Sequence, residues 1–286
     1  MKLDKSKSIL IVGLGLIGGS YAMKLKKEGF TVKAITRSQS SIDYALENGL
    51  IDEGTTEVDA RLIGEADIIV FALYPHIFIK WIKENQHLFK SGAVITDVTG
   101  VKCSIVYEIQ SILRDDVEFI AAHPMAGREV YGVENSDDSI FLGANYIVVP
   151  TDKNTPEAIE LCSSLGEILE FKTVTELSPE KHDEMIAFLS QLTHCIAVSL
   201  MCANDSPGLE HYTGDSFRDL TRIARINDDM WSELFLSNRE ALLKEMESFM
   251  TSFQEMYDCI KNNERDRMRE MMRCSTERRK RFDKII

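Results

Sequence analysis

A histidine follows a short apolar run that predicts a buried strand. The run spans residues 117–120, and His123 stands in the stretch AAHPMAG at 121–127. Pro124 has no backbone N–H to give to a sheet, so we expect strand pairing to stop there. Ligands of open α/β sheets bind beyond the carboxyl ends of the strands, where an imidazole can exchange a proton near neutral pH. By position alone, His123 is more typical of a strand-end residue than of a catalyst, and the rest of the chain decides between the two.

A glycine-rich loop follows the first predicted strand, residues 8–12. The sequence GLGLIGGS occupies 13–20 and runs into a helical pattern over 21–28. In such a strand–loop–helix unit the first glycine makes a tight turn, the second admits a pyrophosphate, and the third lets helix and strand pack closely. The free N–H groups at the helix start favour phosphate. We therefore predict a dinucleotide bound by Gly13, Gly15, Leu16, Ile17 and Gly18. A tight turn without a ligand is the lesser alternative.

The end of the second predicted strand, residues 30–35, indicates which dinucleotide binds. An NAD-specific site places Asp or Glu there to bond the ribose 2′-hydroxyl, but this chain has Thr36, Arg37 and Ser38. Arg37 can pair with a 2′-phosphate, and the hydroxyls can donate to it. The sequence thus predicts a preference for NADP over NAD. An exposed loop arginine in an NAD-using protein is the alternative.

Strands and helices alternate through the first part of the chain. Further apolar strands are expected at 67–73, 93–97, 117–120, 145–149 and around 169–174, with helices between most of them. This alternation predicts an α/β domain over residues 1–176, with a doubly wound parallel sheet of the Rossmann type. The strand ends then share one rim on the cofactor side, which carries Leu73, Tyr74, Asp97, Thr99, Lys102 and His123.

The rest of the chain, residues 177–286, is predicted to be an all-α domain. A Ser-Pro pair at 178–179 is typical of a helix start, and apolar residues recur with helical spacing from there on. They lie on several helix faces, more than a few helices bury alone, so we expect a homodimer through this domain. A self-contained bundle is the alternative. Two polar pairs at helical spacing, which also suit ordinary helix faces, are Ser190–His194 and Asp219–Arg222.

Composition limits the classes of partner. The chain has 286 residues, 44% hydrophobic and 28% charged, as in ordinary soluble domains. A net charge of −13 disfavours nucleic acid, which attracts basic surfaces. The longest apolar run, 68–74, is too short to span a membrane, and the first residues do not form a signal peptide. The six cysteines form no CxxC pair and lack metal-ligand spacing, so we expect reduced thiols, no metal and a cytoplasmic protein.

Taken together, these motifs resemble those of the prephenate dehydrogenase (TyrA) family, and the resemblance spans essentially the whole chain. The glycine loop alone is unspecific, whereas HPMAG together with FRDLTRIA is highly specific. The matching motifs are GLGLIGGS at 13–20, the Asp97–Lys102 segment, HPMAG at 123–127, SPExHD at 178–183, SQLTH at 190–194, FRDLTRIA at 217–224, and Trp231 with Phe235 and Asn238.

The resemblance implies an oxidoreductase of tyrosine biosynthesis that converts prephenate to 4-hydroxyphenylpyruvate and CO₂, with hydride passing to the nicotinamide. His123 would accept the proton of the ring hydroxyl. Arg222 would hold one carboxylate of the dianionic substrate, with His194 and Arg218 at the other end. The further residues that the resemblance assigns to the substrate site are Glu129 at its mouth, Asp219 steadying Arg222, Trp231 and Lys102.

Two features depart from the family pattern. Many relatives carry a serine two residues before the lysine of the Asp97–Lys102 segment, bonded to the catalytic histidine. This chain has Gly100 there, so that Thr99 or a water molecule would supply the hydroxyl. The second departure is the missing acid after the second strand, which is frequent in arogenate-using relatives and keeps arogenate open as the substrate.

Two alternative hypotheses assign the chain a function outside this family. Another Rossmann-type reductase would place a catalytic lysine on the long helix after the domain boundary, where this chain has Ser190 and His194. A nucleotide-sensing binding protein without catalysis would have lost the polar rim, yet His123, His194 and Arg222 are all present.

Overall fold

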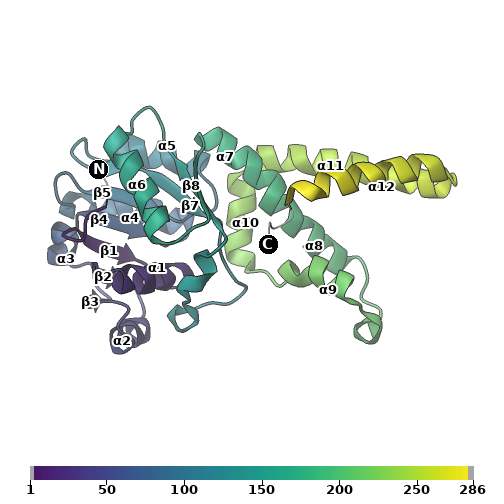
Figure 1. Ribbon diagram of the computed structural model, residues 1–286. Coiled ribbons are helices and arrows are strands. Elements are labelled where there is room, and N and C mark those ends of the chain that lie inside the picture. The colour runs from purple at the N-terminus through teal and green to yellow at the C-terminus, as the bar shows by residue number, and fades with distance from the viewer. Residues whose placement is uncertain (1–2, 283–286) are drawn as a thin grey trace. The chain divides into compact units, whose positions relative to one another are not determined.

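The N-terminal part of the protein is a parallel sheet with helices on both faces (Figure 1). The computed structural model describes residues 3–282. Six strands pair in parallel, in the order β3-β2-β1-β4-β5-β6. Their bounds are β1 (Ser8–Val12), β2 (Thr31–Ile35), β3 (Glu53–Thr55), β4 (Ile68–Phe71), β5 (Val94–Asp97) and β6 (Glu118–Phe119). The predicted α/β fold with a doubly wound parallel sheet is confirmed.

Alternating side chains of β1 are buried against helices on opposite faces of this sheet. Ile9 and Ile11 share a core with Tyr21 of α1, whereas Leu10 shares another with Phe78 of α4. Successive side chains of a strand point to opposite faces, so a wholly apolar strand needs a helix layer on each side. The helices and short turns up to residue 176 are α1 (Leu16–Lys27), α2 (Gln39–Glu47), α3 (Ala60–Glu65), α4 (Pro75–Asn85), η1 (Gln86–Leu88), α5 (Cys103–Ile112), η2 (Val133–Asn135), η3 (Asp138–Phe141) and α6 (Pro156–Ile168).

The strand that leads to His123 is split between two sheets. β6 pairs with only two residues of β5, and after Ile120 the chain leaves β5 for a separate three-stranded sheet. The expectation that His123 stands just past a strand is therefore wrong, since His123 lies within β7, opposite Ile147. The strand does end at Pro124, as the missing N–H predicts. This sheet consists of β7 (Ala121–Pro124), antiparallel to β8 (Asn145–Val149), which is parallel to β9 (Thr173–Glu176).

Within the described chain, only helices and turns follow β9, as the sequence predicts. Leu234 of α10 belongs to the same apolar core as Phe78 and Phe119, so α10 shares a core with the large sheet. The elements are α7 (Pro179–Ile186), the π-helical turn η4 (Ala187–Leu192), α8 (Thr193–Cys202), η5 (Leu209–Tyr212), α9 (Asp215–Thr221), η6 (Arg222–Ala224), α10 (Asp228–Ser237), α11 (Arg239–Lys261), α12 (Arg265–Arg279) and η7 (Lys280–Phe282).

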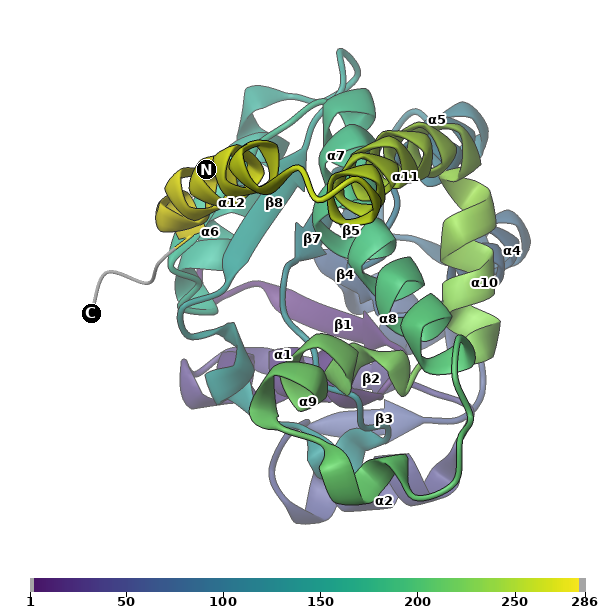
Figure 2. The same ribbon diagram turned by 90° about the vertical axis from the view of Figure 1, so that its right-hand side faces the viewer.

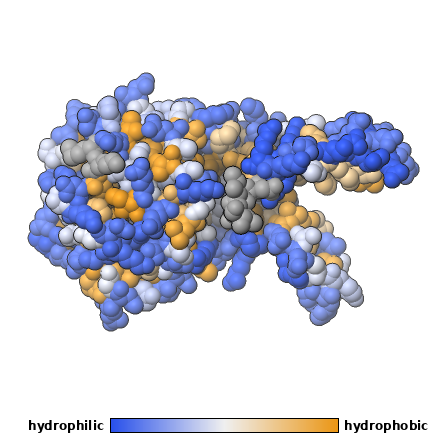
Figure 3. Space-filling view, viewed as in Figure 1, coloured by the Kyte–Doolittle hydropathy of each residue, from blue (hydrophilic) through white to orange (hydrophobic). Residues whose placement is uncertain are grey.

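The chain forms two compact units, Met1–Asn238 and Arg239–Ile286. The second unit contains α11 and α12, which lie side by side (Figures 1 and 2) and are joined by an ion pair of 2.8 Å between Arg267 and Glu255. On the face drawn in Figure 3 this hairpin is mostly hydrophilic, with apolar residues along one edge. The domain boundary expected after residue 176 falls in the turn between β9 and α7 and stays a prediction.

One helical stretch of the described residues, Pro179–Cys202, is long and apolar enough, by length and composition, to cross a membrane. It joins α7, η4 and α8. Its polar residues His182, Asp183 and Gln191 are buried and hydrogen-bonded to other elements. Such bonding is typical of a helix packed within a folded domain.

Candidate active site

The glycine loop between β1 and α1 fits a dinucleotide. Gly13 has a φ of +103°, and a Cβ there would lie 2.4 Å from the carbonyl oxygen of Ala72. A Cβ on Gly18 would lie 2.0 Å from the carbonyl oxygen of Gly13, so the turn and the close packing both require glycine. Gly15 caps α1 without a side-chain hydrogen bond, and nothing lies within 4 Å of where its Cβ would be. There is therefore open space beside Gly15 at the start of α1, where the free N–H groups and the helix dipole favour a phosphate.

A cavity of about 530 Å³ brings together two of the predicted cofactor residues, Arg37 and Tyr74. Arg37 is exposed, and its guanidinium has no ion-pair partner among residues 3–282. The neighbouring Ser38 uses its hydroxyl to cap α2, where it accepts from the N–H of Ser41. The remaining lining residues are His76, Ile77, Tyr131, Ile226, Asn227, Asp228 and Asp229.

Sequence reasoning missed the part of this cavity that α10 contributes. The side-chain amide of Asn227 donates to the hydroxyl of Tyr74 over 3.1 Å, across 153 residues of chain. His76 contacts Glu233 of α10 through its ring Nδ1, at 2.7 Å. The only sequence signal of Asn227 is its helix-capping role, which does not indicate a ligand.

Asp97, at the end of β5, is the centre of a buried polar network. One carboxylate oxygen accepts from Lys102 Nζ at 2.7 Å and from the Thr99 hydroxyl, and the other accepts from the N–H of Ala122 at 3.1 Å. Lys102 and Asp97 are fully buried, and burial lowers the pKa of Lys102. The network joins the end of β5 to β7, which carries His123.

The structure therefore places Lys102 and Thr99 beneath the site, engaged with Asp97. The Thr99 hydroxyl also lies 3.1 Å from the carbonyl oxygen of Val101 and accepts from Lys102 Nζ at 3.1 Å, so it is not directed at His123. The contact of Thr99 with His123 that the sequence suggested is not made. The direct substrate contact suggested for Lys102 stays a prediction, and the geometry gives Lys102 a supporting position instead.

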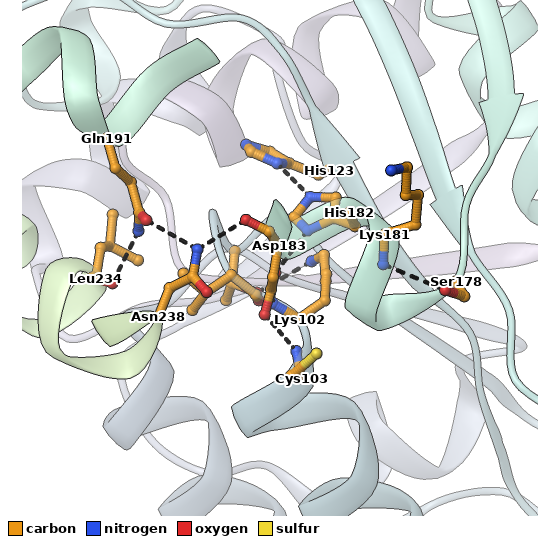
Figure 4. Close-up of polar contacts among 12 residues, drawn as sticks. Lys102, Cys103, His123, Ser178, Lys181, His182, Asp183, Gln191, Leu234 and Asn238 are labelled. Atoms are coloured by element: carbon orange, nitrogen blue, oxygen red, sulfur yellow. Dashed lines mark hydrogen bonds and ion pairs between the residues drawn. The ribbon is translucent and has the colours of Figure 1, made fainter. Parts of the chain in front are cut away.

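His123 is linked to α7 through a second histidine (Figure 4). Its Nδ1 lies 2.8 Å from Nε2 of His182, and Nδ1 of His182 lies 2.7 Å from Oδ1 of Asp183. The Asp183 carboxylate also accepts from the backbone N–H groups of Lys102 and Cys103, each at 2.8 Å. Asp183 thus caps the start of α5. The line of hydrogen bonds from His123 through His182 therefore ends on a carboxylate that is itself held in place.

α7 is held in this position by a buried amide pair (Figure 4). The side-chain amide of Asn238 donates to the backbone carbonyl of Asp183 and to Oε1 of Gln191, both at 2.9 Å. Gln191 in turn donates to the carbonyl of Leu234 at 2.9 Å. Gln191 lies in the π-helical turn η4, and such turns are frequent at functional sites.

The histidines of this group are neutral near pH 7. Burial lowers the pKa of His123 well below its usual value, and the neighbouring His182 and the Lys102 charge lower it further. Burial also lowers the pKa of His182, against the opposing effect of Asp183. Burial would raise the pKa of Asp183, but the hydrogen bonds from His182 and the backbone outweigh it and lower that pKa. Asp183 is therefore ionised while both imidazoles are uncharged.

The other ring nitrogen of His123 faces Gly100. A Cβ at position 100 would lie 4.0 Å from His123 Nε2, and 3.4 and 3.6 Å from the two methyl carbons of Leu234. A side chain at position 100 would therefore approach this nitrogen, and the resemblance described above places a serine at this position in many relatives.

Arg222 and His194 approach the loop that follows HPMAG. Arg222, exposed at the start of η6, forms an ion pair with Glu129. His194 Nδ1 donates to the carbonyl of Ser190 at 2.9 Å, and its ring stacks on Trp231 with centroids 3.7 Å apart. Burial lowers the pKa of His194. The structure thus brings together four of the residues that the sequence assigned to the substrate.

Two other predicted residues lie elsewhere on the same segment. Arg218 forms an ion pair of 2.7 Å with Asp215 and also donates to Thr213. In the described chain, the ion-pair partner of Arg222 is Glu129 and not the expected Asp219, which is exposed on α9. Glu129 lies in the loop between β7 and η2, and its ion pair connects this loop with η6. No group of three or more His, Cys, Asp or Glu side chains in residues 3–282 has metal-binding geometry.

Known proteins match this chain over most of its length. The nucleotide-binding domain of prephenate dehydrogenase matches residues 21–174, and the dimerization domain of prephenate dehydrogenase matches residues 178–274. The prephenate dehydrogenase of Lactococcus lactis subsp. cremoris (strain MG1363) is 31% identical over 268 residues, which cover 91% of this chain and 72% of that protein.

Two crystal structures match almost the whole length of this chain. Prephenate dehydrogenase from A. aeolicus, in complex with hydroxyphenyl propionate and NAD⁺, matches with a TM-score of 0.89 and 30% identity over 97% of this chain and 98% of that chain. Synechocystis arogenate dehydrogenase matches with a TM-score of 0.82 and 26% identity over 96% of this chain and 100% of that chain.

Proposed function

Because the chain belongs to the prephenate dehydrogenase family, we propose that it catalyses the NAD(P)-dependent oxidative decarboxylation of prephenate to 4-hydroxyphenylpyruvate and CO₂. The observation that carries the proposal is the placement of His123. Its Nδ1 is bonded to His182, and its Nε2 is on the side of Gly100, within the same compact unit as the glycine loop and Arg222. A neutral imidazole held in this way is suited to act as a general base.

His123 accepts the proton of the ring hydroxyl as that carbon loses its hydride. When bound, the nicotinamide supplies the hydride acceptor. The oxidised ring then loses CO₂ and becomes an aromatic phenolate, and the imidazolium of His123 can return its proton to that oxygen to give the phenol. The remaining task of the protein is to orient the ring, which is a matter of positioning rather than of further chemistry.

Arg222 binds a carboxylate of the dianionic substrate. Its side chain is 64% exposed and paired with Glu129, so a substrate carboxylate can replace Glu129 as the partner of the guanidinium. His194 lies next to this pair, because Glu129 and Arg222 both act on its pKa. The stacking on Trp231 fixes the plane of the His194 ring, and Nδ1 donates to Ser190, so Nε2 can donate to the second acidic end of the substrate once the carboxylate has drawn a proton onto the ring.

We propose NADP as the preferred cofactor. The guanidinium of Arg37 supports this, because it lines the cavity and forms no ion pair with residues 3–282, as does the lack of a carboxylate at positions 36–38. The relative from A. aeolicus binds NAD⁺, so NAD⁺ is the necessary comparison. Arogenate is the second candidate substrate, supported by the similarity to the Synechocystis arogenate dehydrogenase.

We also propose a homodimer through the helical half of the chain. The matching family domain is described as a dimerization domain, and several large apolar side chains of these helices are exposed. The exposed side chains include Phe188, Leu189, Leu200, Met201, Leu236, Met250, Phe253 and Ile260. Light scattering on the protein as it elutes from a size-exclusion column should give a molar mass twice that of the chain. A monomeric mass at micromolar concentration would contradict the proposal.

The activity is tested by incubating the protein with prephenate or arogenate and with NAD⁺ or NADP⁺, while the absorbance of the reduced cofactor is followed. We expect turnover of prephenate, faster with NADP⁺. Absence of turnover with all four pairs would refute the proposed function.

A further inference from the structure

Two buried residues of α7, His182 and Asp183, have no part in the reaction proposed above. The side chain of His182 is fully buried, and that of Asp183 is 5% exposed. His182 contacts Nδ1 of His123 and Asp183 follows it (Figure 4), whereas Gly100 is on the side of the other ring nitrogen, Nε2. Burying a polar side chain is costly unless its hydrogen bonds are made, and here both ring nitrogens of His182 have partners.

The hydrogen bonds of this line fix which atom carries each proton. The Asp183 carboxylate accepts two backbone N–H groups at the start of α5, which favours its ionised form. An ionised carboxylate can only accept, so His182 Nδ1 must donate to it. A neutral imidazole has one donor and one acceptor, so His182 Nε2 is an acceptor, and the facing Nδ1 of His123 must be the donor.

We propose that His182 is a positioning residue which, together with Asp183, holds His123 in the tautomer protonated at Nδ1. His123 Nε2 then carries the lone pair and faces the position where the substrate hydroxyl is bound. The role of this tautomer in catalysis rests on the proposed function, in which His123 accepts that proton.

The opposite tautomer is disfavoured by the same contacts. If His123 carried its proton on Nε2, its Nδ1 would be an acceptor, and His182 would have to donate from Nε2. His182 Nδ1 would then face the Asp183 carboxylate as a second acceptor at 2.7 Å, which leaves two lone pairs in contact in a buried site. An aspartate that holds a histidine in one tautomer is known from serine-protease triads, where its loss costs about 10⁴-fold in kcat.

The proposal also explains how His123 is oriented without a hydroxyl at position 100. The ring is fixed from behind by His182 and through its own backbone by β7. When His123 becomes charged, its Nδ1–H can strengthen the hydrogen bond to His182, and the charge is stabilised by the line of dipoles that ends on Asp183.

The direct test is ¹⁵N NMR of the imidazoles in the full-length protein labelled with ¹⁵N-histidine, recorded at neutral pH without substrate. The His123 signals are assigned by their loss in His123→Gln. We expect a protonated Nδ1 and an unprotonated Nε2 for His123. A His123 ring protonated at Nε2 would overturn the proposal. The measurement needs no turnover, so a protein inactive on all four substrate–cofactor pairs would refute the proposed function and leave this result standing.

Two variants of His182 distinguish a role in positioning His123 from a role only in maintaining the fold. In His182→Gln the amide nitrogen can donate to Asp183 and the amide oxygen can accept from His123, as His182 does, whereas His182→Leu can do neither. We expect His182→Leu to lower kcat by about 10²–10⁴-fold and His182→Gln to recover at least about tenfold of that loss, with little change in the KM for substrate.

The matched control is His87→Gln, at an exposed histidine of η1, which should leave kcat unchanged. Equal kcat in His182→Leu and His182→Gln would contradict the proposal, as would a loss expressed only in KM. If His182→Leu does not fold, the comparison of His182→Gln with the wild-type protein by NMR still decides: the Nδ1-protonated tautomer of His123 must persist there.

Discussion

The guanidinium of Arg222 forms an ion pair with the carboxylate of Glu129, although the two residues are 93 positions apart in the chain. Glu129 lies in the loop after β7, two residues past the end of the HPMAG segment, and Arg222 begins η6. The pair therefore connects the loop beyond His123 with the helical segment FRDLTRIA. In the proposed reaction this is the point at which a substrate carboxylate is bound.

Replacement of this arginine should affect substrate binding more than turnover. A charge-assisted hydrogen bond contributes about 1.5–3 kcal/mol, so we expect Arg222→Ala to raise the KM for prephenate about 10–100-fold, with a smaller change in kcat. Arg222→Lys keeps the charge but not the bidentate geometry and should be intermediate. Initial-rate kinetics over a range of prephenate concentrations measure both values, and an unchanged KM in Arg222→Ala would refute the assignment.

A hydroxyl at position 100 should assist His123. The Cβ of a serine would lie 4.0 Å from His123 Nε2 and in ordinary contact with Leu234, so the side chain fits. A neutral hydrogen bond contributes about 0.5–1.5 kcal/mol, and we expect Gly100→Ser to raise kcat about two- to tenfold. Gly100→Ala adds the same carbon without the hydroxyl and is the matched control. If the serine and alanine variants have the same kcat, the hydroxyl has no effect at this position.

Arg37 should distinguish the two cofactors. Its guanidinium is free of ion pairs in the described chain, and a 2′-phosphate offers it a partner that NAD⁺ lacks. We expect Arg37→Ala to weaken NADP⁺ about 10–100-fold and NAD⁺ by less than about threefold. Dissociation constants from calorimetric titration give the comparison, in which equal losses for both cofactors would mean that Arg37 does not contact the 2′-phosphate.

The pH dependence follows from the direction of the His123 pKa. Burial, His182 and the Lys102 charge hold that pKa below its usual value near 6.5, and the neutral form is the base. As the pH falls, kcat/KM should therefore stay constant through 6.5 and decline only at lower pH. The profile is measured for the wild-type protein under buffers of constant ionic strength. An acid limb centred at or above 6.5 would contradict the lowered pKa.

The parallel sheet was predictable because apolar runs such as those of β1 and β4 alternate with helical patterns, whereas β3, with the sequence EGT, gave no such signal and was missed. The path of the strand that leads to His123 was not predictable. The sequence predicts a strand over 117–120 that ends before His123, but β6 pairs with only two residues of β5, and the carboxylate of Asp97 then accepts the N–H of Ala122. A side chain replaces the sheet partner at that point. No local sequence pattern shows this, because the contact joins residues 25 positions apart.

The same limit applies to the candidate site. The motifs were enough to identify His123, His194 and Arg222. They did not indicate which residues contact these side chains. His182 is 59 residues from His123, and its contact exists only because α7 packs against the start of α5 through Asp183. Thr99 and Lys102 have the types expected of site residues, yet both are turned towards Asp97. Side-chain direction depends on the tertiary packing, which the motif does not specify.

The central claim is that His123 accepts the substrate proton, and kcat of His123→Asn tests it most directly. Asparagine keeps a polar side chain of similar size in β7 but cannot take up a proton at neutral pH. With the preferred substrate and cofactor, we predict a kcat about 10²–10⁴-fold below that of the wild-type protein, with an unchanged dissociation constant for the cofactor. A kcat within about threefold of the wild-type value would contradict the account.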